Sequence, residues 1–102
     1  MSKNELNLLL YLESCLVDGY GRCEGIKMNK EDFDIMNEWK NSHYIDYGRN
    51  KIKEIERLHK IRGKNFTHWV RLSEKAWIDA HAERKARSIR MIERMQKEAT
   101  DE

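Results

Sequence analysis

Six side chains in the sequence are of types that bind zinc, namely four histidines and two cysteines. They are His43, His59, His68, His81, Cys15 and Cys23. No pair has the C-x-x-C spacing of structural zinc sites, and no H-x-x-x-H occurs. His68 stands beside Trp69, and His81 follows Trp77 by one helical turn. We interpret the histidines as packing and hydrogen-bonding residues and predict no metal site.

Nucleophilic catalysis needs a serine or cysteine with a neighbouring base and an orienting acid. Ser73 precedes a predicted helix, so a capping role explains it. Cys23 follows Arg22, whose charge would lower the pKa of the thiol, but no orienting acid stands at a recognisable spacing. The glycines of residues 19–25 are not followed by the Gly-Lys-Ser/Thr of a phosphate-binding loop. We expect no enzymatic activity and no cofactor.

Basic residues concentrate in the middle of the chain. Residues 1–42 carry 5 Lys/Arg against 8 Asp/Glu, residues 43–72 carry 8 against 3, and residues 73–102 carry 7 against 7. The basic residues around the middle are Arg49, Lys51, Lys53, Arg57, Lys60, Arg62 and Lys64. Lys and Arg contacts with phosphates dominate nucleic-acid affinity. This segment therefore favours a nucleic-acid contact, with a solvated surface turn as the alternative.

The first half of the chain is predicted to be mostly helical. Leucines at helical spacing indicate a helix over residues 4–18, which the glycines that follow would end. Residues 22–28 are predicted to be a short strand or an extended connection. Asn29 is a good N-cap, and Asp32 could reach back to it as in a capping box. The second helix is therefore expected from Asn29 to residues 41–43.

The second half is predicted to contain a strand pair. Residues 44–58 alternate like a strand, with a bulge or kink near Gly48. Residues 52–58 could instead be helical, because Ile52, Ile55 and Leu58 are spaced by three. A turn is expected at residues 62–65 and a strand at 66–72. Ser73 should then cap a long helix over residues 74–99.

This order predicts an α+β winged helix with a two- to three-stranded antiparallel sheet and a long C-terminal helix. Residues 1–102 would be a single winged-helix domain. The wing would be the turn between the last two strands. Its expected DNA contacts are Arg57, Lys60, Arg62 and Lys64.

The second helix would occupy the recognition position of this fold. The residues expected to face DNA there are Lys27, Lys30, Asn37, Lys40 and Asn41. Against this, the helix also carries Glu31, Asp32, Asp34 and Glu38, which phosphates would repel. DNA binding by this helix requires that the acids point away from the groove.

Aromatic and apolar residues suggest two further assignments. Trp39, Trp69 and Trp77 are expected to be mostly buried core residues, with a base-stacking platform as the alternative. The helix over residues 74–99 outruns a domain of this size. Its apolar positions Ile89, Ile92 and Met95 are predicted to form a dimer seam, with a free single helix as the alternative.

The sequence contains no apolar run near the ~20 residues that cross a bilayer. Its start also lacks the basic region and small-residue cleavage site of a signal peptide. We therefore expect a cytoplasmic protein, in a host cell if the protein is viral. A reducing compartment would keep both cysteines as thiols.

Three stretches resemble a group of small winged-helix-like proteins of phages, prophages and plasmids. They are M-N-K-E-D-F-D-I-M-N-E-W at residues 28–39, Y-I-D-Y-G-R at 44–49 and T-H-W-V-R-L-S-E-K-A-W-I-D-A-H-A-E-R at 67–84. The resemblance implies a fold and a mobile-element context, and it carries over no functional residues. The chain departs from a standard helix-turn-helix, because little room precedes the Asn29 helix for the extra helix.

Two functions of different classes fit these features. The first is a winged-helix protein of a phage or mobile element that binds double-stranded DNA, as a dimeric transcriptional regulator. The second is a non-enzymatic protein-interaction module or inhibitor, which would bind a host or phage protein through the same fold. The sign of charge on the second helix separates the two.

Overall fold

The computed structural model describes residues 1–100. Within them the chain forms α1 (Lys3–Gly19), β1 (Arg22–Cys23), the 3-10 turn η1 (Gly25–Lys27), α2 (Lys30–Asn41), β2 (Ile45–Arg49), α3 (Ile52–Arg62), β3 (His68–Leu72) and α4 (Glu74–Thr100). Helices and an antiparallel sheet are both present, which confirms the α+β class. The long C-terminal helix is also confirmed.

The part of the chain that the structure describes has one three-stranded sheet, in the order β1–β3–β2. β3 pairs antiparallel with β2 from Ile45 opposite Leu72 to Arg49 opposite His68, so the predicted pairing of these segments is confirmed. β1 pairs with the other edge of β3, also antiparallel. The β2–β3 pairs run one to one, so the bulge expected near Gly48 does not occur within β2.

The turn predicted to join these strands directly is wrong, because α3 lies between them. Residues 52–62 follow the helical alternative, with Leu58 buried and Ile55 half-buried on one side. Gly63 then ends the helix in the left-handed region at φ 69°, where its N–H donates to the His59 carbonyl at 2.8 Å. The strand expected from residue 66 begins only at His68. Phe66 is nevertheless buried.

α2 and α4 begin at the capping residues that the sequence predicts. Asn29 caps α2, its side chain accepting from the Asp32 N–H, while the Asp32 carboxylate accepts from the Asn29 N–H. Ser73 caps α4, because its hydroxyl accepts from the Ala76 N–H at 3.1 Å. Both caps are confirmed predictions. η1, one turn of 3-10 helix, occupies the short stretch before Asn29.

The core lies where α1, α2 and the first half of α4 meet the sheet. Its most buried side chains include Leu8, Leu9, Leu12, Met36, Val70, Ala76 and Ala80. Trp39 belongs to this core and is 8% exposed. Trp69 and Trp77 are also mostly buried, as predicted, but they keep some exposed surface and lie outside the central core cluster. Trp69 lies against Gly48 and the Arg71 guanidinium, at the surface of the sheet.

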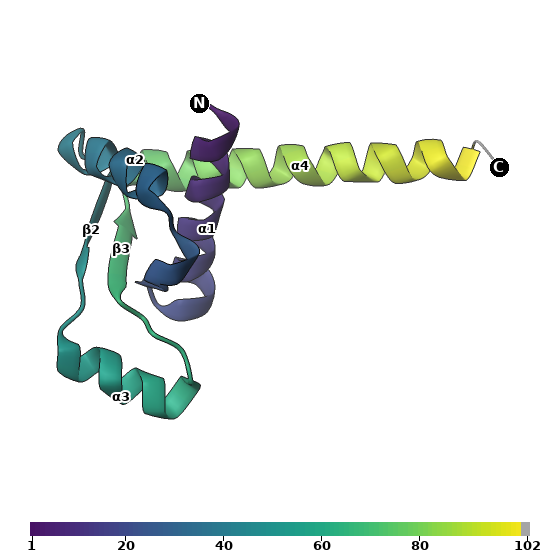
Figure 1. The fold of residues 1–102 in the computed structure, drawn as a ribbon. Helices are drawn as coiled ribbons and strands as arrows, with labels where there is room; N and C mark the ends of the chain where they lie inside the picture. The colour runs from purple at the N-terminus through teal and green to yellow at the C-terminus, as the bar shows by residue number, and fades with distance from the viewer. Residues whose placement is uncertain (101–102) are drawn as a thin grey trace.

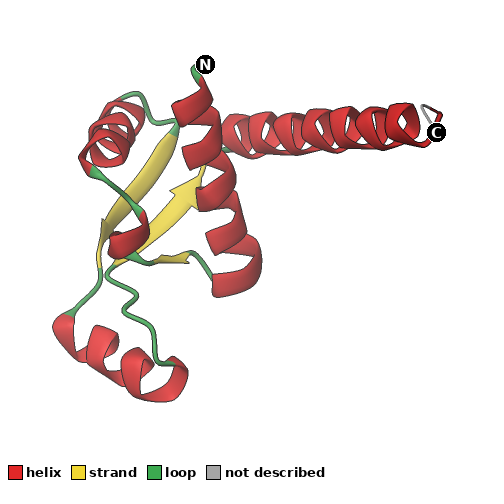
Figure 2. Ribbon diagram, turned by 45° about the vertical axis from the view of Figure 1, so that its right-hand side comes forward, coloured by secondary structure: helices red, strands yellow, loops and turns green. Residues whose placement is uncertain are grey.

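Two elements extend from this body. α3 lies at the end of β2 and β3 farthest from α4, and the C-terminal half of α4 extends away from the other elements (Figures 1 and 2). The molecule consequently measures 56 × 34 × 24 Å along its principal axes. Across residues 1–100, none of the helices combines the length and the apolar character that a membrane crossing requires.

Candidate nucleic-acid interface

α3 is held to the body by few contacts. Leu58 is 3% exposed, and Phe66 in the segment after the helix is 8% exposed. Glu54 forms an ion pair with Arg22 of β1 at 3.5 Å, between two partly exposed side chains. Ile52 and Ile61 are by contrast 69% and 67% exposed. α3 is thus anchored on one side and open to solvent on the others.

The open side of α3 is basic. Residues 49–64 carry seven Lys/Arg against Glu54 and Glu56. Lys53, Arg57 and Lys60 stand at i, i+4 and i+7, so they share one exposed face of the helix. Glu56 lies beside this face and is also exposed. The arrangement can neutralise several phosphates at once.

The structure separates the four residues predicted for the wing. Arg57 and Lys60 lie on the open face of α3. Arg62 and Lys64 line a cavity of about 230 Å³ between the end of α3 and the end of α1. Arg22 and Lys27 line the same cavity, and so do two carboxylates, Asp18 and Glu24. The basic surface therefore has two sides and is not a single tip.

The residues predicted on and before α2 are largely engaged within the molecule. Lys27 pairs with Glu24 at 2.9 Å. Asn37 accepts a hydrogen bond from the Tyr47 hydroxyl. Lys40 donates to the Tyr47 carbonyl at 3.0 Å and lies 3.8 Å from a carboxylate oxygen of Asp46. The other two predicted residues, Lys30 and Asn41, are exposed.

Three of the four acids of α2 lie on or beside its predicted DNA-facing side, and the fourth, Asp32, caps the start of the helix. Asp34 stands one turn after Lys30 and one turn before Asn37, so it shares their stripe, and it is exposed. Glu31 and Glu38 are exposed on the adjoining stripe. This face would repel phosphates, which makes α3 the better candidate interface.

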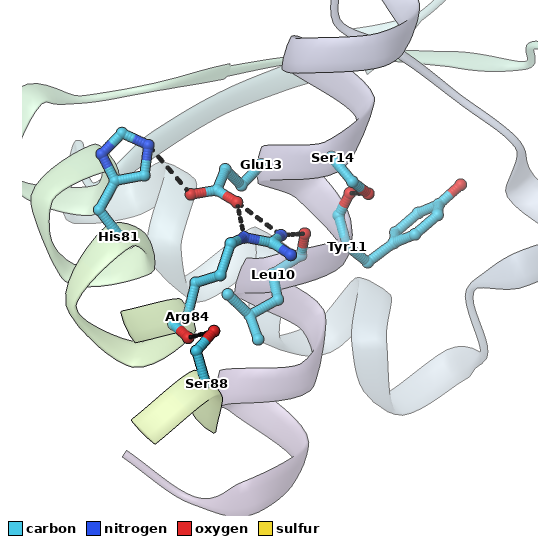
Figure 3. A network of polar contacts seen from close by, with 7 residues as sticks. All are labelled: Leu10, Tyr11, Glu13, Ser14, His81, Arg84 and Ser88. Carbon is cyan, nitrogen blue, oxygen red and sulfur yellow. Dashed lines mark hydrogen bonds and ion pairs between the residues drawn. The ribbon is translucent and has the colours of Figure 1, made fainter. Parts of the chain in front are cut away.

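Glu13 is a residue that the sequence analysis did not single out. It is 2% exposed on α1, and the Arg84 guanidinium of α4 reaches its Oε1 at 2.5 Å (Figure 3). Arg84 also donates to the Leu10 carbonyl at 3.3 Å. Nε2 of His81 lies 3.3 Å from the other carboxylate oxygen, outside hydrogen-bonding geometry. The sequence indicates a role for Glu13 only by its position, because this carboxylate stands four residues after the buried Leu9, on the apolar side of the helix.

The histidines and cysteines do not form a metal centre. No group of three or more His, Cys, Asp or Glu residues within residues 1–100 is arranged to hold a metal ion. His68 packs against Phe33 at 5.1 Å between ring centres, and burial followed by the Arg49 charge lowers its pKa. The Arg22 charge was predicted to lower the pKa of the Cys23 thiol. This prediction is wrong, because the interaction with Cys15 and burial raise that pKa.

The predicted seam residues lie on the extended half of α4. Ile89, Ile92 and Met95 are 45%, 53% and 62% exposed. They are thus accessible to a partner.

No family model, curated protein sequence or solved structure matches the chain.

Proposed function

We propose that the protein is a winged-helix protein that binds double-stranded DNA mainly through α3 and its flanking residues. The order of elements supports this fold: a helix, an edge strand, a short turn, a second helix, and then two strands with an excursion between them. The β1–β3–β2 order of the sheet fits as well. In this proposal η1 replaces the usual first helix of the helix-turn-helix, and α3 is built into the wing.

The basic open face of α3 is the observation that carries the proposal. A helix is about 10–12 Å wide, which matches a major groove about 12 Å wide. Lys53, Arg57 and Lys60 on that face would contact phosphates at the groove edge. α2 is less suited to contact DNA, because its exposed side carries Asp34 and because Asn37 and Lys40 already have partners. In a phage or mobile element such a protein would act as a transcriptional regulator.

The test is duplex affinity measured against salt concentration. Replacing Lys53, Arg57 and Lys60 together with Ala should weaken binding for all sequences and lower the salt slope by about 0.9 for each lost phosphate contact. The fold should persist, because the three side chains are exposed. The matched control replaces Lys3, Lys75 and Lys85 with Ala, which changes the net charge equally on other elements.

Two outcomes would contradict the proposal. If the wild-type protein binds no duplex at low salt, DNA binding is excluded. If the control triple loses as much affinity as the α3 triple, the contact is not located on α3.

A second candidate function rests on α2. Its exposed Glu31, Asp34 and Glu38 form an acidic surface on one side of the helix. Such a surface would attract a basic partner, as expected of a protein-interaction module or inhibitor. Titration with an arginine-rich peptide tests it. Salt-sensitive binding that disappears in the triple Glu31→Gln, Asp34→Asn, Glu38→Gln variant would favour this function over DNA binding.

A further inference from the structure

The fold brings together the chain's two cysteines from different elements. Cys15 lies in α1 and Cys23 in β1, and both are free thiols in the same buried cluster. Tyr20 takes the left-handed conformation at φ 55°, and the Gly21 N–H then donates to the Cys15 carbonyl at 2.9 Å. The chain thus turns back beside Cys15. The two thiols interact closely enough that each shifts the pKa of the other.

The two thiols differ in their access to solvent. Cys23 is completely buried. Cys15 is 8% exposed and lines the cavity of about 230 Å³ described above. The charged groups around that cavity are Arg22, Lys27, Arg62 and Lys64, with Asp18 and Glu24. A small neutral oxidant can therefore reach Cys15 from the cavity, whereas Cys23 has no exposed surface and does not line the cavity.

The surroundings of Cys15 favour its thiolate. The Tyr11 hydroxyl accepts from the Glu24 N–H at 3.1 Å and donates to the Glu24 carbonyl at 3.5 Å, and Tyr11 lines the same cavity as Cys15. The interaction with Cys23, and to a smaller extent that with Tyr11, holds the pKa of the Cys15 thiol below its ordinary value against the opposing effect of burial. Burial in turn raises the pKa of Tyr11, so the hydroxyl stays a donor. The thiolate is the nucleophilic form of cysteine.

We propose that Cys15 and Cys23 form an oxidation site for hydrogen peroxide, in which Cys15 is attacked first and Cys23 resolves it. The Cys15 thiolate attacks one peroxide oxygen, the O–O bond breaks, and hydroxide leaves, giving a sulfenic acid. The Cys23 thiol then attacks the Cys15 sulfur. An S–S bond forms, the S–O bond breaks, and the Cys23 proton leaves with the hydroxyl group as water.

This site is independent of the DNA-binding proposal. The site consists of the two thiols, Tyr11 and the cavity, and its oxidation requires no contact between the basic residues and phosphate. Oxidation can be followed in the free protein. The two proposals can therefore fail separately.

The experiment begins with the full-length wild-type protein at neutral pH. After treatment with hydrogen peroxide, its intact mass should fall by two hydrogen atoms, and proteolysis should yield the segments around Cys15 and Cys23 as one disulfide-linked product. A disulfide that joins two chains would overturn the proposal. So would folded protein whose thiols stay unmodified under conditions that oxidise the same protein in guanidinium chloride.

Two variants assign the roles. Cys23→Ser should accumulate a sulfenic acid on Cys15, trapped by dimedone. Cys15→Ser should leave Cys23 reduced over the same time, because that thiol is buried and protonated. Oxidation of Cys23 at the wild-type rate in the folded Cys15→Ser variant would refute the assignment of Cys15 as the attacking thiol.

Tyr11→Phe provides the conservative test of thiolate stabilisation. The variant keeps the ring and removes the hydroxyl donor. The oxidation rate of Cys15 should fall about threefold, because the lost thiolate fraction is partly offset by the greater nucleophilicity of a more basic thiolate. An unchanged rate in the folded variant would show that the surroundings do not activate Cys15.

Discussion

Glu13 occupies a position on α1 where a charge is costly unless it is paired. Arg84 of α4 supplies two nitrogen atoms to one carboxylate oxygen, each at 2.5 Å. Arg84 is itself half exposed, with 51% of its side chain accessible, so only the carboxylate has lost most of its water. The pair joins the first helix to the last, and its effect is on stability and on the placement of α4.

Removal of Arg84 is therefore expected to destabilise the fold strongly. Arg84→Ala leaves the Glu13 carboxylate buried without its main partner, which should cost about 2–4 kcal/mol in unfolding free energy. Arg87→Ala is the matched control. Arg87 pairs with Glu83 and reaches Asn7, but its loss should cost less than about 1 kcal/mol because Arg90 still pairs with Glu83 at 3.2 Å and Asn7 is exposed. Urea denaturation measures both, and equal costs would contradict the role given to Glu13.

From the sequence alone, only the Glu13 half of this ion pair can be predicted. A glutamate four residues after Leu9 on an apolar helix face indicates that a cation must come from elsewhere. Which cation cannot be deduced, because Arg84 is 71 residues away along the chain. Its position depends on how α4 crosses α1. The Cys15–Cys23 contact is hidden for a similar reason, since it depends on how the chain turns back after Gly21.

Among the elements, those with local signals were predictable. Asn29 and Ser73 cap their helices because each side chain meets an N–H three residues later. α3 was ambiguous. Its apolar residues recur every three positions over a short segment, which fits both alternation with a bulge and one helical face. The structure resolves it as a helix that exposes Ile52 and Ile61 and buries Leu58.

Within the sheet, Gly48 allows the close approach of Trp69. A Cβ at residue 48 would lie 2.7 Å from the Trp69 indole, too close for normal contact. Gly48→Ala should therefore force the ring outward and destabilise the protein by about 1–3 kcal/mol. Trp69 is partly exposed, so the ring can move and the cost stays below that of a closed core site.

Gly19→Ala is the control for this substitution. A Cβ there would meet no atom within 4 Å, and the residue ends α1 without a positive φ. The change should leave stability equal or raise it by up to about 1 kcal/mol, through reduced freedom of the unfolded chain. The melting temperature should thus fall for Gly48→Ala and stay equal or rise for Gly19→Ala. A stable Gly48→Ala protein would contradict the packing of β2 against Trp69.

At the scale of the whole molecule, two extended helices lie at different ends of one body. The open face of α3 is basic, and the extended half of α4 carries apolar side chains (Figure 1). A helix of about 12–15 residues is marginal alone in water. The half of α4 beyond α1 is in this range, so association with another surface would stabilise it. Pairing of two α4 helices would place two α3 helices on one symmetric dimer, as a regulator that binds paired half-sites requires.

The last prediction is that Ile89, Ile92 and Met95 form the seam of that dimer. Replacing all three with Asn should shift the protein from dimer to monomer in sedimentation equilibrium. The melting temperature at high dilution should change little, since these side chains are already 45–62% exposed in one chain. The control replaces Ile26, Ile52 and Ile61, which are more exposed but lie on other elements, and it should keep the dimer. A wild-type protein that stays monomeric at the highest soluble concentration would contradict the seam, and α4 would then be a single extended helix.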